Sequence, residues 1–205
     1  SLNKVYQFSF QQALENTKKN GGKTEGNSIT IKRQPIKPVQ WEQSFPTLVS
    51  DGSGGAIIAW VDDRYGNNYD IYAQRVDANG VIQWFLDGVA VCEATNYQAS
   101  PTIASDGNGG ALIIWQDKRS GNYDIYAQRI NADGSTQWTM DGVAICIEVG
   151  TQEYPTAISD GNGGAITTWT SGSSHDIYAQ LIDSNGIVQW TSNGVAICTA
   201  LWAQA

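Results

Sequence analysis

One pattern of about 54 residues occurs three times in tandem in this 205-residue chain, and no other feature constrains the fold as strongly. Pro46, Pro101 and Pro155 open the copies, so the repeat spacing is 55 and then 54 residues. Each copy then carries, in the same order, a DGxGGA segment, a tryptophan, a DIYAQ segment, a QW pair and a GVAxC segment. A unit of this length cannot bury its apolar surface alone, so we expect the copies to stack on one another.

Within each copy the pattern predicts four antiparallel strands. Glycine-rich or Asn/Asp-Gly turns separate them, because glycine adopts the positive φ values that tight hairpins require. In the first copy the predicted strands run from Pro46 to Ser50, from Ala56 to Asp62, from Tyr69 to Val76 and from Val81 to Leu86. A longer connection then leads to the next copy. The predicted repeat domain spans residues 43–205, divided into 43–97, 98–151 and 152–205.

Two folds are built from repeats of this kind, the β-propeller and the β-trefoil. Three copies complete a trefoil, whereas propellers have four to eight blades. The second strands, however, read AIIAW, ALIIW and AITTW, and this lack of alternation is typical of strands covered on both faces. We therefore expect an all-β fold of propeller-type blades, with the β-trefoil as the alternative.

The first 42 residues differ from the repeats in charge. They contain seven Lys and Arg against three acidic residues, whereas the repeats contain five against seventeen, and the whole chain has a net charge of −8. An acidic repeat domain argues against nucleic acid as a partner. In this basic N-terminal arm we expect a short helix at about 10–19 and a strand at about 28–33, which pack on the repeats or bind a partner. No run of about eighteen apolar residues occurs, so no membrane-spanning helix is predicted.

A longer motif suggests a family. The run DGxGGAxxxWxDxRxGxxDIYAQRxDxxGxxxW, from Asp51 to Trp84 and again from Asp106 to Trp138, resembles repeats of large secreted or cell-surface bacterial proteins with propeller-like architecture. The resemblance covers about residues 43–204 and implies a propeller fold in a secreted, cell-surface or periplasmic location. Such repeats do not define one activity, and the third copy lacks the DxR element.

Three blades would leave two apolar faces open. A fourth copy begins at the C-terminus, where Gln204 falls in phase with Gln43. We expect the open faces to be covered by a second copy, by further chain or by the arm. A two-fold dimer with six blades is the simplest closed arrangement. Thr167 and Thr168 make the last blade more polar than the others, which suits a capping blade.

Residues with catalytic chemistry are scarce, and we predict no catalytic residue and no metal site. The one histidine, His175, lies in a shortened loop and is expected at the surface. Cys92, Cys146 and Cys198 occupy equivalent positions, so we expect buried small hydrophobic side chains rather than disulfides. The DANG, NADG and DSNG segments contain possible Ca²⁺ ligands, but no bidentate acid follows at the spacing of the helical calcium motif, so turn formation is favoured.

Two sets of residues remain as candidates for ligand binding. The first consists of Asp/Arg pairs two residues apart, which either stabilise the blade or contact a ligand. The second consists of aromatic residues beside amides and carboxylates, a combination that suits sugars because sugar faces stack on aromatic rings. The candidate ligand-binding residues are Asp62, Arg64, Tyr65, Tyr69, Asp117, Arg119 and Tyr123, with Trp41 and Trp202 as further exposed aromatics.

These observations favour a non-catalytic binding module that recognises glycans or protein partners through repeated loops. A structural protein whose open blades mediate self-association is the alternative. A propeller hydrolase is the least favoured, because its acids would have to converge on one channel, whereas the acids of this chain are distributed by the repeat.

Overall fold

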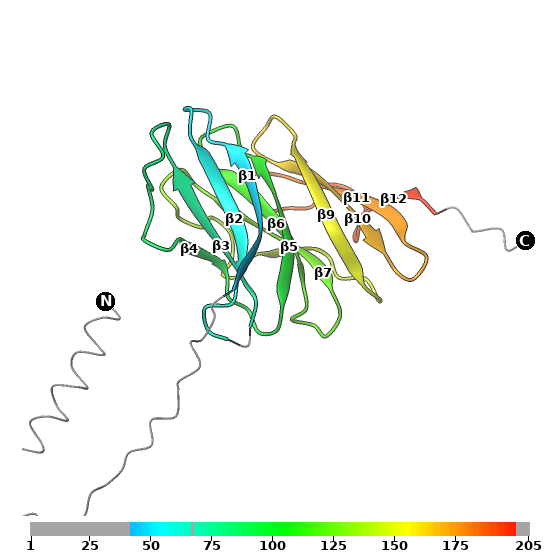
Figure 1. The fold of residues 1–205 in the computed structure, drawn as a ribbon. Helices are drawn as coiled ribbons and strands as arrows, with labels where there is room; N and C mark the ends of the chain where they lie inside the picture. Colours follow the sequence, from blue (N-terminus) through cyan, green and yellow to red (C-terminus); the bar gives the residue numbers. More distant parts are fainter. Residues whose placement is uncertain (1–41, 67, 200–205) are drawn as a thin grey trace, which may run out of the picture. The chain divides into compact units, whose positions relative to one another are not determined.

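The computed structural model describes residues 42–66 and 68–199, and this part of the chain folds as twelve β-strands without a helix (Figure 1). The strands are β1 (Gln43–Ser50), β2 (Ala56–Asp62), β3 (Asp70–Val76), β4 (Val89–Cys92), β5 (Gln98–Ser105), β6 (Ala111–Asp117), β7 (Asp124–Ile130), β8 (Val143–Cys146), β9 (Gln152–Ser159), β10 (Ala165–Ser171), β11 (Asp176–Ile182) and β12 (Val195–Cys198). The helix and strand predicted in the arm lie outside the described residues. No described segment is a helix of the length and apolarity needed to cross a membrane.

Each repeat forms one antiparallel four-stranded sheet whose strands pair in chain order. We call these sheets blade 1 (β1–β4), blade 2 (β5–β8) and blade 3 (β9–β12). The blades stand side by side in chain order, and no described strand pairs with a strand of another blade (Figure 1). The fold is therefore all-β, with propeller-type blades.

The strand predictions hold for the second and third strands and fail for the fourth. β2 spans the predicted Ala56–Asp62, β3 begins one residue later than predicted, and β1 begins earlier, at Gln43. The fourth strand is not 81–86 but Val89–Cys92. Residues 81–86 form only an isolated bridge with β3.

The side chain of Gln74 explains why residues 81–86 are not a strand. Its Oε1 accepts the backbone N–H of Trp84 over 3.0 Å, and its Nε2 donates to the carbonyl of Phe85 over 2.7 Å. These bonds satisfy backbone groups that a β-ladder would otherwise pair. Gln128 and Gln180 make the equivalent bonds in blades 2 and 3.

The DGxGG turns have one construction in all three blades. In blade 1, Oδ1 of Asp51 accepts the backbone N–H groups of Ser53 and Gly55, both over 2.8 Å. A Cβ atom at Gly55 would lie 2.1 Å from the carbonyl oxygen of Val76, so this position requires glycine. Asp106 and Asp160 form the same turn.

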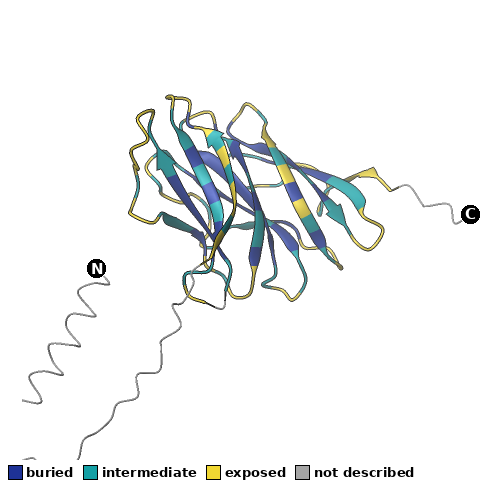
Figure 2. Ribbon diagram, in the orientation of Figure 1, coloured by how far each residue is buried: buried dark blue, intermediate teal, exposed yellow. Residues whose placement is uncertain are grey.

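The core lies between the blades rather than within them. One apolar cluster joins blade 1 to blade 2, and a second joins blade 2 to blade 3. All seven residues of β6 are buried, as expected for a strand covered on both faces. In β9 only Gln152 and Pro155 are buried, and four of its eight residues are exposed (Figure 2).

The prediction of three buried cysteines is correct for two of them. Cys92 and Cys146 are buried, and burial raises the pKa of the Cys146 thiol to about 11. Cys198 is exposed, because no described blade packs on that side of blade 3. All three thiols are free.

Candidate functional site

The Asp62–Arg64 pair forms a compact network inside blade 1. Asp62 accepts Nε of Arg64 over 2.9 Å and Nη2 over 2.7 Å, and it also accepts the indole N–H of Trp60 over 2.9 Å. The guanidinium lies 3.6 Å above the ring of Tyr72. The Asp62 side chain is only 1% exposed. Nη2 of Arg64 also donates to the carbonyl of Asp87, which ties this network to the chain segment before β4.

Asp117 and Arg119 repeat this network in blade 2. Arg119 contacts Asp117 over 2.9 and 2.6 Å, lies 4.0 Å above the ring of Tyr126, and donates to the carbonyl of Asp141. Both pairs hold parts of their own blade together through charge-assisted hydrogen bonds. Their contact with a ligand stays a prediction, and the geometry gives them a stabilising role.

Blade 3 shows what the loss of the DxR element does. Ser171 occupies the position of the aspartate in β10, and the indole N–H of Trp169 is buried without a hydrogen-bond partner among the described residues. A buried unpaired donor costs on the order of 1–3 kcal/mol. The blade nevertheless forms the same four strands.

Buried carboxylates face each other across β2 and β3. Asp62 pairs with Asp70 in the strand register, and Asn68 donates to Asp70 over 2.7 Å. Burial raises the pKa of Asp70 to about 7, and the carboxylates of Glu93 and Asp62 add to the shift. Burial also raises the pKa of Asp124, its counterpart in blade 2. Among the described residues no group of three or more His, Cys, Asp or Glu side chains is placed to hold a metal ion.

Three tyrosines and Phe45 line a pocket of about 450 Å³ between blades 1 and 2. We call it the tyrosine pocket. Its described lining consists of Glu42, Ser44, Phe45, Val61, Tyr69, Tyr97, Ala99 and Tyr123. The rings of Tyr69 and Tyr97 lie 5.2 Å apart at an interplanar angle of 44°. The pocket therefore combines aromatic faces with one carboxylate, the Ser44 hydroxyl and the phenolic hydroxyls of the three tyrosines.

Backbone hydrogen bonds between neighbouring segments fix all three tyrosines. The carbonyl of Tyr69 accepts the N–H of Gln98 over 2.7 Å, and that of Tyr97 accepts the N–H of Lys118 over 2.8 Å. The carbonyl of Tyr123 accepts from Gln152 over 2.7 Å. The side-chain nitrogen of Lys118 lies 5.4 Å from the centre of the Tyr123 ring. The rings are thus held on tied backbone positions rather than on free loops.

A bulge in β1 places Phe45 at this pocket. The register of β1 against β2 shifts between Ser44 and Thr47, and Phe45 has a φ of 51°. Positive φ is strained for a bulky residue. Phe45 is 68% exposed although it is aromatic, so this strained segment presents an open aromatic face.

The structure brings together two of the predicted ligand-binding tyrosines, Tyr69 and Tyr123, in one pocket. Tyr65 is 68% exposed and does not line it. Tyr97 was missed, although the sequence holds a signal: it directly precedes the second copy, where the other copies have Glu42 and Thr151. Trp41 and Trp202 lie outside the described residues. His175 is exposed, as predicted.

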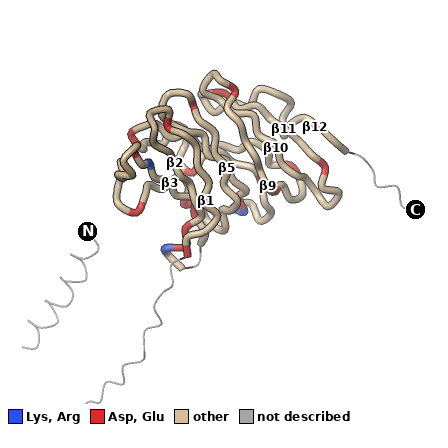
Figure 3. The backbone as a smooth tube through the Cα atoms, turned by 45° about the horizontal axis from the view of Figure 1, so that its top comes forward, with Lys and Arg blue, Asp and Glu red and all other residues tan. Residues whose placement is uncertain are grey.

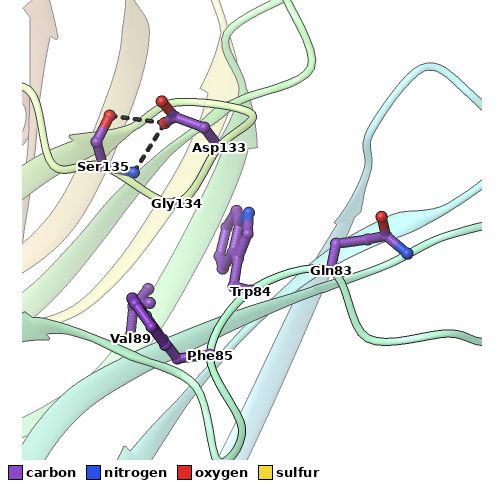
Figure 4. A pocket seen from close by; sticks show the side chains of 7 residues that line it. All are labelled: Gln83, Trp84, Phe85, Val89, Asp133, Gly134 and Ser135. Carbon is purple, nitrogen blue, oxygen red and sulfur yellow. Dashed lines mark hydrogen bonds between the residues drawn. The ribbon is translucent and has the colours of Figure 1, made fainter.

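A second hollow, of about 480 Å³, lies at the joint between blades 1 and 2 (Figure 4). Trp84 from blade 1 stands over the turn at Gly134 of blade 2, and its indole N–H donates to the carbonyl of Ala132 over 3.0 Å. Because the tryptophan is already engaged, this hollow is part of the packing between blades.

The surface of the repeats is acidic. Each described arginine is paired with an aspartate of its own blade, in the pairs Arg64–Asp62, Arg75–Asp51, Arg119–Asp117 and Arg129–Asp106. The remaining acidic residues are spread over several loops and strands (Figure 3). Such a surface disfavours polyanionic partners.

The stacked sheets define an all-β protein with propeller-type blades. No protein-family model matches the chain, and no curated protein matches it. Among solved structures it is similar to the endo-arabinase from Bacteroides thetaiotaomicron VPI-5482, with 15% sequence identity and a TM-score of 0.43. The match covers 80% of this chain and 62% of the endo-arabinase chain. A likeness this distant carries no argument about activity.

Proposed function

We propose that this protein is a non-catalytic binding module that recognises glycans through the tyrosine pocket. The observation that carries the proposal is the convergence of Tyr69, Tyr97 and Tyr123 with Phe45 on one pocket of about 450 Å³. Flat aromatic faces suit the apolar faces of sugar rings. The carboxylate of Glu42 and the hydroxyl of Ser44 supply partners for sugar hydroxyls.

The composition of the pocket supports binding rather than glycoside hydrolysis. Most glycoside hydrolases use two carboxyl groups that flank the scissile bond. Glu42 is the one acidic residue in the described lining of the tyrosine pocket. Asp62 and Asp117 are buried in their own ion pairs. We therefore propose that bound glycans are recognised and not cleaved.

The proposed location is extracytoplasmic, at the cell surface, in the periplasm or secreted. It rests on the resemblance of the repeats to those of secreted and cell-surface bacterial proteins. A glycan-binding module is useful where glycans are displayed, so this location and the proposed function agree.

A second candidate is a structural protein whose blades exist to associate, and one observation favours it. Apolar residues on the outer blades are exposed, among them Leu48 at 67% and Ile197 at 59%. Exposed apolar surface of this kind marks association sites. We propose that self-association completes the propeller, and this is compatible with glycan binding.

A glycan array followed by calorimetry on the full chain tests the glycan proposal. Tyr97→Ala and Tyr123→Ala are expected to weaken binding of an array-selected oligosaccharide at least about tenfold, because a stacking face is lost. Tyr97→Phe and Tyr123→Phe keep the ring and are the matched controls, expected to bind within about threefold of the parent.

Tyr65→Ala tests the exposed tyrosine separately. Loss of binding in this variant alone would move the site to the loop between β2 and β3. If no glycan on the array binds and a protein ligand binds at the tyrosine pocket, the chain is a protein-binding module instead.

A further inference from the structure

One tryptophan contact is repeated at both joints between blades. In the first joint the ring of Trp84 lies on Gly134 (Figure 4). Its indole N–H donates to the carbonyl of Ala132 over 3.0 Å. A Cβ atom at Gly134 would lie 2.9 Å from the ring, so a side chain there would displace the tryptophan. The second joint repeats this contact over 3.2 Å with Trp138, Gly186 and Ser184.

A hydrogen bond from a backbone N–H to a side-chain oxygen is also repeated at both joints. The N–H of Glu93, just after β4, donates to the carboxylate of Asp141 in blade 2 over 2.9 Å. The N–H of Ile147, just after β8, donates to the side chain of Asn193 in blade 3 over 3.2 Å. We call the side of a blade that makes these donations its back face, and the receiving side its front face.

The front face of blade 1 has an open glycine position equivalent to those on which the tryptophans of the internal joints pack, and we call this position the seat. Gly80 occupies the position of Gly134 and Gly186, and no heavy atom of the described residues lies within 4 Å of a Cβ built on it. Ala78 supplies the carbonyl that corresponds to that of Ala132, and Asp87 occupies the position of Asp141.

On the back face of blade 3, Trp190 packs on no glycine of a following blade among the described residues. Trp190 is 37% exposed, yet its backbone N–H donates to Gln180 over 2.9 Å, as that of Trp84 does to Gln74 over 3.0 Å. Its backbone is therefore held in the position that the joint uses. Thr199, just after β12, supplies a backbone N–H in the position of Glu93.

The two open faces carry apolar residues at the positions that are also apolar in the joints between blades. On the front face, Leu48 is 67% exposed, whereas its counterpart Ile103 in blade 2 is 7% exposed. On the back face, Ile197 is 59% exposed, whereas its counterpart Ile145 is 3% exposed. The difference measures what a neighbouring blade covers.

The cysteines and arginines of the open faces are also complementary. In the first joint the Cys92 thiol lies 3.3 Å from Nη2 of Arg119. At the open faces, Cys198 is exposed, and Arg64, the counterpart of Arg119, has no thiol partner among the described residues.

We propose that the back face of blade 3 docks on the front face of blade 1 of a second copy of this chain. In this contact the Trp190 ring packs on Gly80 and its indole N–H donates to the carbonyl oxygen of Ala78. This rests on the proposed completion of the propeller by self-association and gives that association its contacts. Two such docking events join two chains into a closed ring of six blades. The tyrosine pocket is separate from the seat, because Tyr69 precedes β3 and Gly80 follows it.

The proposed joint lacks one contact that both internal joints have. Arg75 and Arg129 each donate to a carbonyl of the next blade, over 3.1 and 3.3 Å. Leu181 occupies this position in blade 3. The proposed joint therefore lacks one hydrogen bond and is expected to be weaker and reversible.

Sedimentation velocity on the full chain, under reducing conditions because Cys198 is exposed, tests the proposal. The parent is expected to form a concentration-dependent dimer. Gly80→Asn and Trp190→Ala are each expected to weaken dimerisation at least about 30-fold, the effect of removing an interface anchor. Gly107→Asn is the matched control, because Gly107 has nearly the same φ, 76° against 77°, and equally open space but lies in blade 2. It is expected to dimerise like the parent.

Mixing the two variants distinguishes this docking from a symmetric contact of like faces. Each variant alone carries the defect in both contacts of its ring. A 1:1 mixture still offers one intact contact, between the back face of the Gly80→Asn chain and the front face of the Trp190→Ala chain. Mixing is expected to restore hetero-association at least about tenfold tighter than either variant alone.

Three results would overturn the proposal. Mixing without restored association would show that the faces do not meet back to front. If both variants dimerise like the parent, the chain self-associates but not through these contacts. If the parent chain stays monomeric at its highest soluble concentration, self-association is excluded as well. The open faces would then be covered by other segments of the chain.

Discussion

Blade 2 and blade 3 carry the same tryptophan after the same strand, yet they satisfy it differently. The N–H of Trp115 donates to Asp117, which is in turn held by Arg119. The N–H of Trp169 is buried without a partner among the described residues. Both blades nevertheless have the same four strands and the same strand order. Turns and packing between blades therefore determine the blade, whereas the Asp/Arg network adds stability to a blade that already forms.

The largest expected effect comes from removing the network in blade 2. Asp117→Ala removes the carboxylate partner of Arg119, which keeps only its bond to the carbonyl of Asp141, and leaves the buried N–H of Trp115 without its acceptor. The free energy of unfolding should therefore fall by about 3–5 kcal/mol. Chemical denaturation measures it. Ser171→Ala, the same position in blade 3, is the control and should stay within about 0.5 kcal/mol. Equal losses in the two variants would contradict the comparison.

A smaller loss is expected when blade 2 is made like blade 3 at a second position. Arg129→Leu removes the ion pair with Asp106, whose side chain is 1% exposed, and reproduces the leucine that blade 3 has as Leu181. Asp106 keeps its backbone donors, so the loss should be about 1–3 kcal/mol in denaturant unfolding. Leu181→Met in blade 3 is the control for packing at this position. A loss below about 0.5 kcal/mol would show that the pair adds nothing.

Grafting the network into blade 3 should raise the stability of the protein. Replacing residues 171–175 with DKRSGNY, the residues 117–123 of blade 2, gives Trp169 an acceptor and should raise the free energy of unfolding by about 1 kcal/mol. The control is a graft of equal length, NKQSGNY, which keeps the loop and removes the ion pair. If both grafts change stability equally, loop length rather than the network is responsible.

The last effect is a slope of stability against pH and concerns the pair of facing carboxylates in blade 1. The pKa of Asp70 is raised to about 7, so between about pH 4 and pH 7 the folded state retains a proton that the unfolded state has lost. The free energy of unfolding should therefore decrease with rising pH in this window. Asp70→Asn should flatten that slope in denaturant titrations at several pH values.

Asp133→Asn is the control for the pH prediction. Hydrogen bonds from Ser135 lower the pKa of Asp133, so its contribution changes below pH 4 and leaves the window unaffected. A slope that survives in Asp70→Asn would assign it to other groups.

Much of the fold could be predicted from the repeat, and the failures have physical causes. Ala56–Asp62 was predictable because it is an apolar run between glycine turns. The fourth strand was misplaced because the Gln74 side chain, and not a neighbouring strand, binds residues 84 and 85. Local sequence pattern does not show such a side-chain bond.

The candidate site could be predicted only in part. Aromatic composition pointed to Tyr69 and Tyr123, but their meeting depends on backbone bonds from one blade to the next. Tyr97 escaped because it breaks the repeat, and repeat analysis weights what recurs. The exposure of Cys198 was missed because equivalent positions were expected to be equivalent in burial, and a terminal blade has only one neighbour.

The most direct test of glycan recognition is an NMR titration of the full chain carrying ¹³C-labelled tyrosine with the array-selected oligosaccharide. The ring signals of Tyr69, Tyr97 and Tyr123 are expected to shift together in a saturable manner, while that of Tyr178, in the joint between blades 2 and 3, stays in place. Saturable binding that leaves these three signals unmoved would contradict the tyrosine pocket as the glycan site.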